Sequence, residues 1–267
     1  MSYPVQTPLR LSPVHDQLQS LKGTWREING MPVVAEVLEV AKKLPVAIAD
    51  LSYLRRFGIK GSGAIAWLAQ QGFPIPAQPN SWNALPNGDI IVRLGMSEFL
   101  IEAGVDPPPP PITTGELESQ SPPVPLSKGD AAGRGIKDLG GNSSDPPPPP
   151  FTRGELESQD LPPQVYPVLR QDLAIALYGT SAHELLRQTC SFNFRALSLS
   201  DRPVVLTSMI GVSVTVIPGD RNSIPFYRIW CDGTFGAYFW ETLLAIAQEL
   251  GGGAIGIEQV ERMKDEG

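Results

Sequence analysis

The chain has 267 residues, of which 42% are hydrophobic, and a formal net charge of -7 with a pI near 4.9. This composition can supply a buried core for one large domain or two small ones. The acidic balance argues against nucleic-acid binding, which needs a basic face, and against an anionic membrane surface as a partner. No apolar run approaches the ~18 residues of a membrane span, and the N-terminus lacks a signal-peptide pattern, so we expect a soluble cytoplasmic protein.

Residues 1–25 are expected to form an arm with at most a short helix over 15–22. Residues 31–46 fit either a short helix or a strand and turn, because Pro32 and Pro45 limit a helix to a few turns. The sequence alone leaves these two alternatives open.

Residues 48–68 predict a strand, a glycine-dense turn and the start of a helix with Ser62 as its N-cap. Gly58, Gly61 and Gly63 tolerate positive φ or a close approach of backbone. Glycines ahead of a helix can also bind phosphate through their backbone amides. The G-x-x-G-x-G spacing matches neither the dinucleotide nor the Walker pattern, so we favour a tight strand-to-helix turn.

The helix should end near Gly72, because closely spaced prolines follow it. Residues 79–83 are interpreted as a loop. The segments 89–94 and 99–102 are then expected to pair as a hairpin, since both are apolar and a glycine-containing turn joins them.

A proline-rich segment begins at Asp106, and its sequence recurs almost unchanged from Asp145. A solenoid is rejected because each copy has almost no apolar residues to stack and there are only two copies. The interval 128–144 has too little apolar surface to offset its ordering entropy, and runs of proline form stiff polyproline II. We therefore expect a disordered, duplicated proline-rich insertion over 106–162, in which residues 122–125 fit a P-x-x-P ligand pattern.

The chain becomes foldable again at Gln164. Residues 165–186 are expected to contain a strand or short helix and then a helix from near Ser181. The elements predicted after them are, in order, turn and strand material over 189–194 and 196–199, a β-rich run over 204–217, a turn over 218–223, a strand over 226–231, a helix from the hinge 232–235 to Leu250, and a charged tail over 258–267. Within the β-rich run, Val212, Val214 and Val216 alternate with polar residues, which predicts a half-buried strand.

The inventory of chemical groups is short. His15 and His183 cannot form a metal site alone, and Cys190 and Cys231 lack metal-type spacing, so we expect two free thiols. The chain contains neither a G-x-S-x-G nucleophile elbow nor a G-x-G-x-x-G fingerprint, and therefore no evident flavin or nicotinamide site of its own. We predict no catalytic residue. Five aromatic residues are expected in the core or at a subunit contact: Trp67, Trp82, Trp230, Tyr238 and Trp240.

Several segments resemble the folate-binding T-protein-like fold, which the glycine cleavage T-protein shares with the gamma subunit of heterotetrameric sarcosine oxidase. They are DLSYLRRFGIKGSGAIAWL (50–68), the R-L-G and E-F-L-I text within 93–101, LRQTCSFNF (186–194) and YRIWCDGTFGAYFWETLLAIAQELG (227–251). The gamma-subunit version is the most similar, because Arg56-Phe57-Gly58 and Trp67-Leu68 fall where that family has such residues.

The resemblance implies an α+β, T-protein-like domain that is discontinuous, with residues 1–105 and 163–257 on either side of the insertion. It also implies a non-flavin structural subunit of a complex that demethylates sarcosine to glycine and passes the one-carbon unit to tetrahydrofolate. Larger sarcosine oxidase-type subunits would be the partners, and they alone would carry flavin and NAD. Tetrahydrofolate is the one cofactor that the resemblance allows for this chain.

Asp89 is the candidate folate ligand, because T-protein relatives use an aspartate near this place to bind the folate ring, and carboxylates suit paired N–H donors. This sequence lacks the D-D motif of catalytic relatives, and it also lacks their downstream glutamate and arginine. The residues themselves favour the interpretation of Asp89 as a turn carboxylate after Asn87-Gly88. Two other functions are therefore carried forward: a stand-alone folate-binding or aminomethyltransferase-like protein, and an interaction protein that acts through the proline-rich insertion.

Overall fold

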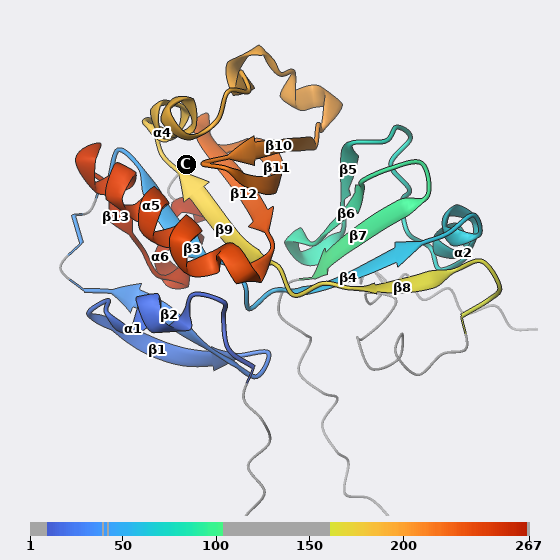
Figure 1. Ribbon diagram of the computed structural model, residues 1–267, viewed down its shortest axis with the longest axis horizontal. Helices are drawn as coiled ribbons and strands as arrows, with labels where there is room; N and C mark the ends of the chain where they lie inside the picture. Colours follow the sequence, from blue (N-terminus) through green and yellow to red (C-terminus); the bar gives the residue numbers. More distant parts are fainter. Residues whose placement is uncertain (1–9, 39, 42, 104–160, 266–267) are drawn as a thin grey trace, which may run out of the picture. The chain divides into compact units, whose positions relative to one another are not determined.

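The computed structural model describes residues 10–38, 40–41, 43–103 and 161–265 (Figure 1). The predicted insertion lies outside the described residues, except for its last two positions. The described chain is a mixed α+β structure of three sheets and a few helices, as predicted. None of its helices is both long enough and apolar enough to cross a membrane.

The largest sheet has six strands in the order β10-β11-β12-β9-β3-β13, all antiparallel except the β3–β13 pair. Its strands are β3 (Ala47–Asp50), β9 (Leu173–Tyr178), β10 (Val205–Met209), β11 (Val212–Arg221), β12 (Ile224–Cys231) and β13 (Gly253–Ala254). Val212, Val214 and Val216 are buried and Ser213 is exposed, which confirms the predicted alternation.

The second sheet has five strands in the order β5-β6-β7-β4-β8. Its strands are β4 (Arg55–Lys60), β5 (Ser81–Ala84), β6 (Ile90–Arg93), β7 (Glu98–Ala103) and β8 (Tyr166–Leu169). The predicted hairpin is confirmed as the antiparallel β6–β7 pair, but part of the predicted loop over 79–83 belongs to strand β5.

A separate two-stranded sheet pairs β1 (Gly23–Ile28) with β2 (Met31–Val37), so the segment 31–46 contains a strand rather than a helix. The α-helices are α1 (His15–Gln19), α2 (Ala64–Gln70), α4 (Ala182–Thr189), α5 (Gly236–Glu249) and α6 (Ile257–Asp265). The predicted helices near His15, Ser181 and Gly236 are therefore present. The segment predicted as a charged tail is instead largely α6, whose Val260 is buried.

The side chains form three apolar layers because neighbouring residues on a strand face opposite sides of the sheet. Ile175 of β9 belongs to the layer beneath α1, α4 and α5, whereas its neighbour Ala174 belongs to the layer that includes Leu100 of the second sheet. The third layer lies between the other face of the second sheet and α2, where Trp67 is buried.

Strands from before and after the insertion share both large sheets. In the second sheet, β4 lies between β7 and β8 (Figure 1). In the six-stranded sheet, β3 lies between β9 and β13. Each sheet is therefore completed only when both halves of the chain are present.

The structure corrects several predicted boundaries. Residues 48–60 form two strands in different sheets, because the Asp50 side chain accepts a hydrogen bond from Ser52 N at 2.9 Å and turns the chain there. The predicted turn over 218–223 is shorter, since β11 continues to Arg221. The strand material predicted near 196–199 consists of short 3-10 turns, over Phe194–Ala196 and Leu199–Asp201.

Candidate functional site

The glycine turn before α2 is closed by packing against its own chain. Gly61 N donates to the Ser97 carbonyl at 3.0 Å, and Gly63 N donates to the Gln164 carbonyl at 3.1 Å. The Ser62 hydroxyl bonds the Gln164 side chain at 2.7 Å, and α2 begins after Gly63 without a side-chain cap. The amides that a phosphate would need are thus already used, which supports the tight-turn interpretation and corrects the prediction that Ser62 is the N-cap.

Asp89 lies at the end of a 3-10 turn over Pro86–Gly88 (η1), immediately before β6. Its carbonyl accepts a hydrogen bond from Leu85 N at 2.8 Å, and its side chain is buried, with the residue 9% exposed. The next residue, Ile90, lines a cavity whose other lining residues include three arginines, but Asp89 does not line it. The folate role of Asp89 stays a prediction.

A buried carboxylate, Glu102 on β7, joins the two large sheets. Glu102 is 1% exposed, and its oxygens accept hydrogen bonds from Arg56 at 3.1 Å, from Arg228 at 2.7 Å and from Trp230 Nε1 at 3.0 Å. Arg56 also donates to the Asp172 carbonyl at 2.9 Å. We call Arg56, Glu102, Arg228 and Trp230 the Glu102 cluster. Two guanidinium groups share one carboxylate, so these four residues carry a formal net charge of +1.

The strand register explains how this cluster forms. On β7, Leu100 and Glu102 face one side of the sheet, while Phe99 and Ile101 face α2. On β12, Arg228 and Trp230 are two residues apart and therefore point to the same side. These two sides pack against each other. Glu102, a charged residue on an otherwise apolar face, therefore meets Arg228 and Trp230 there.

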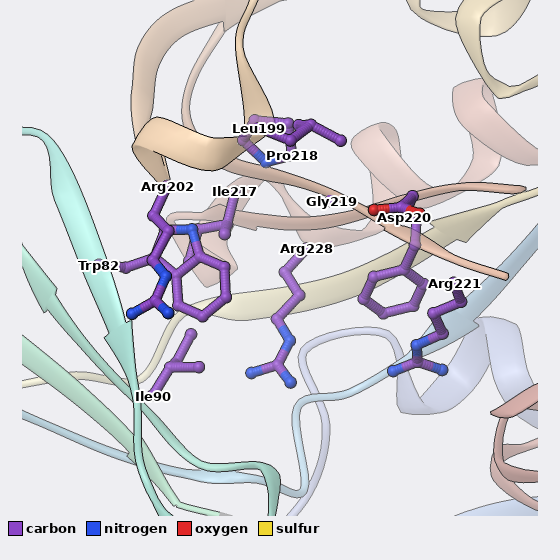
Figure 2. A pocket seen from close by; sticks show the side chains of 11 residues that line it. Trp82, Ile90, Leu199, Arg202, Ile217, Pro218, Gly219, Asp220, Arg221 and Arg228 are labelled. Atoms are coloured by element: carbon purple, nitrogen blue, oxygen red, sulfur yellow. The ribbon is translucent and has the colours of Figure 1, made fainter. Parts of the chain in front are cut away.

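A cavity of about 310 Å³ lies beside the Glu102 cluster, and we call it the arginine pocket. Besides aliphatic residues, its lining includes Trp82, Arg202, Asp220, Arg221, Phe226 and Arg228. Figure 2 shows Arg221 and Arg228 extending in the same direction from β11 and β12, with Arg202 and Trp82 together at the far side.

Two arginines of the pocket, Arg202 and Arg221, are held by aromatic rings and neutral oxygens. Arg221 stacks on Phe226, with its guanidinium carbon 3.7 Å from the ring centroid, and donates to the Val260 carbonyl at 3.3 Å. Burial, and then the neighbouring Arg228, lower the pKa of Arg221 to about 10. Arg202 lies over the Trp82 ring at 5.7 Å and donates to the Asn83 side chain at 3.1 Å. The pocket is therefore a concentration of positive charge with flat apolar walls.

His183, Cys190 and Cys231 lie outside the arginine pocket. His183 Nε2 and the Tyr227 hydroxyl lie 3.1 Å apart, and burial followed by the nearby Arg195 lowers the pKa of His183. Cys190 and Cys231 are buried free thiols, as expected. In the described part of the chain, no group of three His, Cys, Asp or Glu side chains could hold a metal ion.

The aromatic residues divide as follows. Trp67, Trp230 and Trp240 are buried, which confirms the prediction that they belong to the core. Trp82 is half-buried in the arginine pocket, and its ring N–H is covered without a hydrogen-bond partner. Tyr238 is 52% exposed, although its hydroxyl donates to the Ile210 carbonyl at 3.1 Å.

Sequence reasoning missed the Glu102 cluster and the arginine pocket. One signal was present. Glu102 interrupts an apolar face of one predicted strand, and Arg228 shares a face of another predicted strand with Trp230. Neither pattern shows which strands pair within a sheet or which sheet faces pack against each other. The pocket depends on that information, because Trp82 and Arg228 come from opposite sides of the insertion.

Comparison with known proteins defines the fold class. No protein-family model and no curated protein matches the chain. It is similar to the glycine cleavage system aminomethyltransferase T from Bartonella henselae, with a TM-score of 0.62 and 11% sequence identity, over 96% of this chain and 62% of that one. The chain thus has a T-protein-like fold and spans less than two thirds of the aminomethyltransferase.

A second solved structure is the heterotetrameric sarcosine oxidase from Corynebacterium sp. U-96, in complex with pyrrole 2-carboxylate. One of its chains matches with a TM-score of 0.54 and 16% identity, over 90% of this chain and 96% of that chain. Both comparisons support the T-protein-like fold that the sequence motifs predicted. Identities of this size establish the fold alone.

Proposed function

We propose that this chain is a gamma-like, non-flavin structural subunit of a sarcosine oxidase-type complex. The observation that carries the proposal is the extent of the two similarities. The chain covers 96% of a heterotetrameric sarcosine oxidase chain but only 62% of the aminomethyltransferase. A subunit of the first kind therefore accounts for the size of the folded part better than a complete aminomethyltransferase does.

In such a complex the larger subunits would carry flavin and NAD, demethylate sarcosine to glycine and pass the one-carbon unit to tetrahydrofolate. This chain would contribute contact surface. Its aromatic side chains Phe235 and Tyr238, at the start of α5, are 50% and 52% exposed. Aromatic residues of this kind are enriched at the centres of protein interfaces.

We also propose that residues 1–105 and 163–257 form one discontinuous domain. Each of the two large sheets contains strands from both segments, and the Glu102 cluster takes Arg56 from the first and Arg228 from the second. Residues 258–265 extend this body as most of α6, which packs on β2.

Purification from the native host tests the subunit proposal. A tagged chain, expressed at its natural level, is expected to retain a larger flavin-containing chain, which flavin absorbance would reveal. A variant with residues 106–160 replaced by a Gly/Ser linker should retain the same partner, because the described fold does not include those residues. Loss of the partner from that variant alone would favour the interaction-protein hypothesis, and elution of the intact chain without any partner would contradict the proposal.

A stand-alone folate-binding protein or aminomethyltransferase-like enzyme is the second candidate, favoured by the burial of Asp89 next to the lining of the arginine pocket. In that case a tetrahydrofolate analogue at about 1 mM should quench tryptophan fluorescence, since Trp82 lines the pocket. Asp89→Asn, which keeps the side-chain size, should abolish the quenching. Asp16→Asn, on the exposed start of α1, is the control and should quench normally. Absence of quenching in the unsubstituted chain would remove this candidate.

A further inference from the structure

The arginine pocket concentrates charge that its own residues do not neutralise. It is lined by Arg202, Arg221 and Arg228 against a single carboxylate, Asp220. The hydrogen bonds of Arg202 and Arg221 go to neutral oxygens, of Asn83 and Val260. Arg228 does pair with Glu102, but that carboxylate is shared with Arg56.

The guanidinium groups are also held in place before any ligand arrives. Arg221 is fixed by stacking on Phe226, and Arg228 is fixed by Glu102 at 2.7 Å and by the Gly88 carbonyl at 3.2 Å. Donors that are ordered in advance lose less conformational entropy when they bind an anion. Burial, and then the neighbouring Arg228, lower the pKa of Arg221, and a bound anion would oppose both effects.

We propose that the arginine pocket binds a small dianion, either a phosphate group or a pair of carboxylates on a short carbon chain. A dianion matches the excess of guanidinium groups over carboxylates in the pocket, and planar guanidinium groups suit both kinds of oxyanion. The volume of about 310 Å³ is at the lower end for ligand pockets, which favours a small ligand. The site is independent of the subunit role and needs no partner chain.

Isothermal titration of the full chain with inorganic phosphate, succinate and chloride tests the proposal. Phosphate or succinate is expected to bind at least tenfold more tightly than chloride, and the tighter of the two identifies the ligand type. Added salt should weaken the binding. If both dianions bind no better than chloride, the proposal is overturned.

Variants locate the binding site. Arg221→Gln and Arg202→Gln are each expected to weaken dianion binding about tenfold, because each removes one charge-assisted contact. Arg202 is exposed, so its variant should fold even if Arg221→Gln does not. Arg187→Gln, an exposed arginine on α4, is the matched control and should bind as the unsubstituted chain does. Unchanged affinity in a folded Arg202→Gln would place any binding elsewhere. If Arg202→Gln loses dianion binding but still retains the larger subunit, the anion site and the subunit role are independent of each other.

Discussion

Replacing Glu102 with alanine is expected to lower the free energy of unfolding by about 3–5 kcal/mol, the usual cost of removing one partner of a buried ion pair. The substitution leaves Arg56, which is 4% exposed, without its carboxylate and also removes the acceptor of Trp230. Because Arg228 loses the same partner, the packing between the two large sheets should weaken together with the charge balance. Chemical denaturation followed by tryptophan fluorescence measures the change.

Glu98→Ala is the matched control on the same strand. Its carboxylate pairs with Arg170 at 2.9 Å but is 43% exposed, so the loss should not exceed about 1 kcal/mol. Equal losses in the two variants would show that the Glu102 cluster contributes no more than a surface ion pair.

Replacing Gly61 with alanine is expected to cost roughly 2–5 kcal/mol, from backbone strain and from overpacking together. Gly61 has a φ of +124°, and a Cβ there would meet the carbonyl of Gln164, which is main chain and cannot rotate away. The turn before α2 and the start of β8 are held together at this contact. Thermal unfolding of the purified variant measures the loss.

Gly72→Ala separates the two causes. Gly72 follows α2 with a φ of +82°, but a Cβ there would have no atom within 4 Å. Only the left-handed backbone opposes this substitution, so its cost should be about 1–2 kcal/mol. A similar loss at both glycines would contradict the close contact with Gln164.

Local patterns in the sequence predicted much of the fold. The alternation around Val214 predicted a half-buried strand, and the apolar face that includes Phe239 and Leu243 predicted the closing helix. The motifs on either side of the insertion predicted the T-protein-like fold that the structural comparisons support. The strand and the helix depend on neighbours within about ten residues, which is the range over which periodicity is informative, whereas the fold was predicted from the resemblance to a known family.

The boundaries and the candidate site required three-dimensional information. The run from Ala47 to Lys60 has no proline, and no glycine before Gly58, yet it divides between two sheets. The turn that Asp50 makes there is also held by Ser52, whose hydroxyl accepts a hydrogen bond from Ala174 N at 3.1 Å, a contact far away in the sequence. The arginine pocket likewise combines residues from opposite sides of the insertion. Single residues in the sequence carried no signal that Arg202 and Trp82 would stack.

The position of β4 between β7 and β8 determines what a break in the connecting chain would do. Both neighbours run antiparallel to β4, so Ala103 lies opposite Arg55 whereas Tyr166 lies opposite Lys60. A shortened linker between β7 and β8 must therefore run back from the Arg55 end of β4 to its Lys60 end. That distance is about 17 Å and needs at least ~6 extended residues. Two fragments produced by cutting between these strands would each lack members of both large sheets. Such fragments would be obligate complements of one another, suited to reconstitution as a split protein.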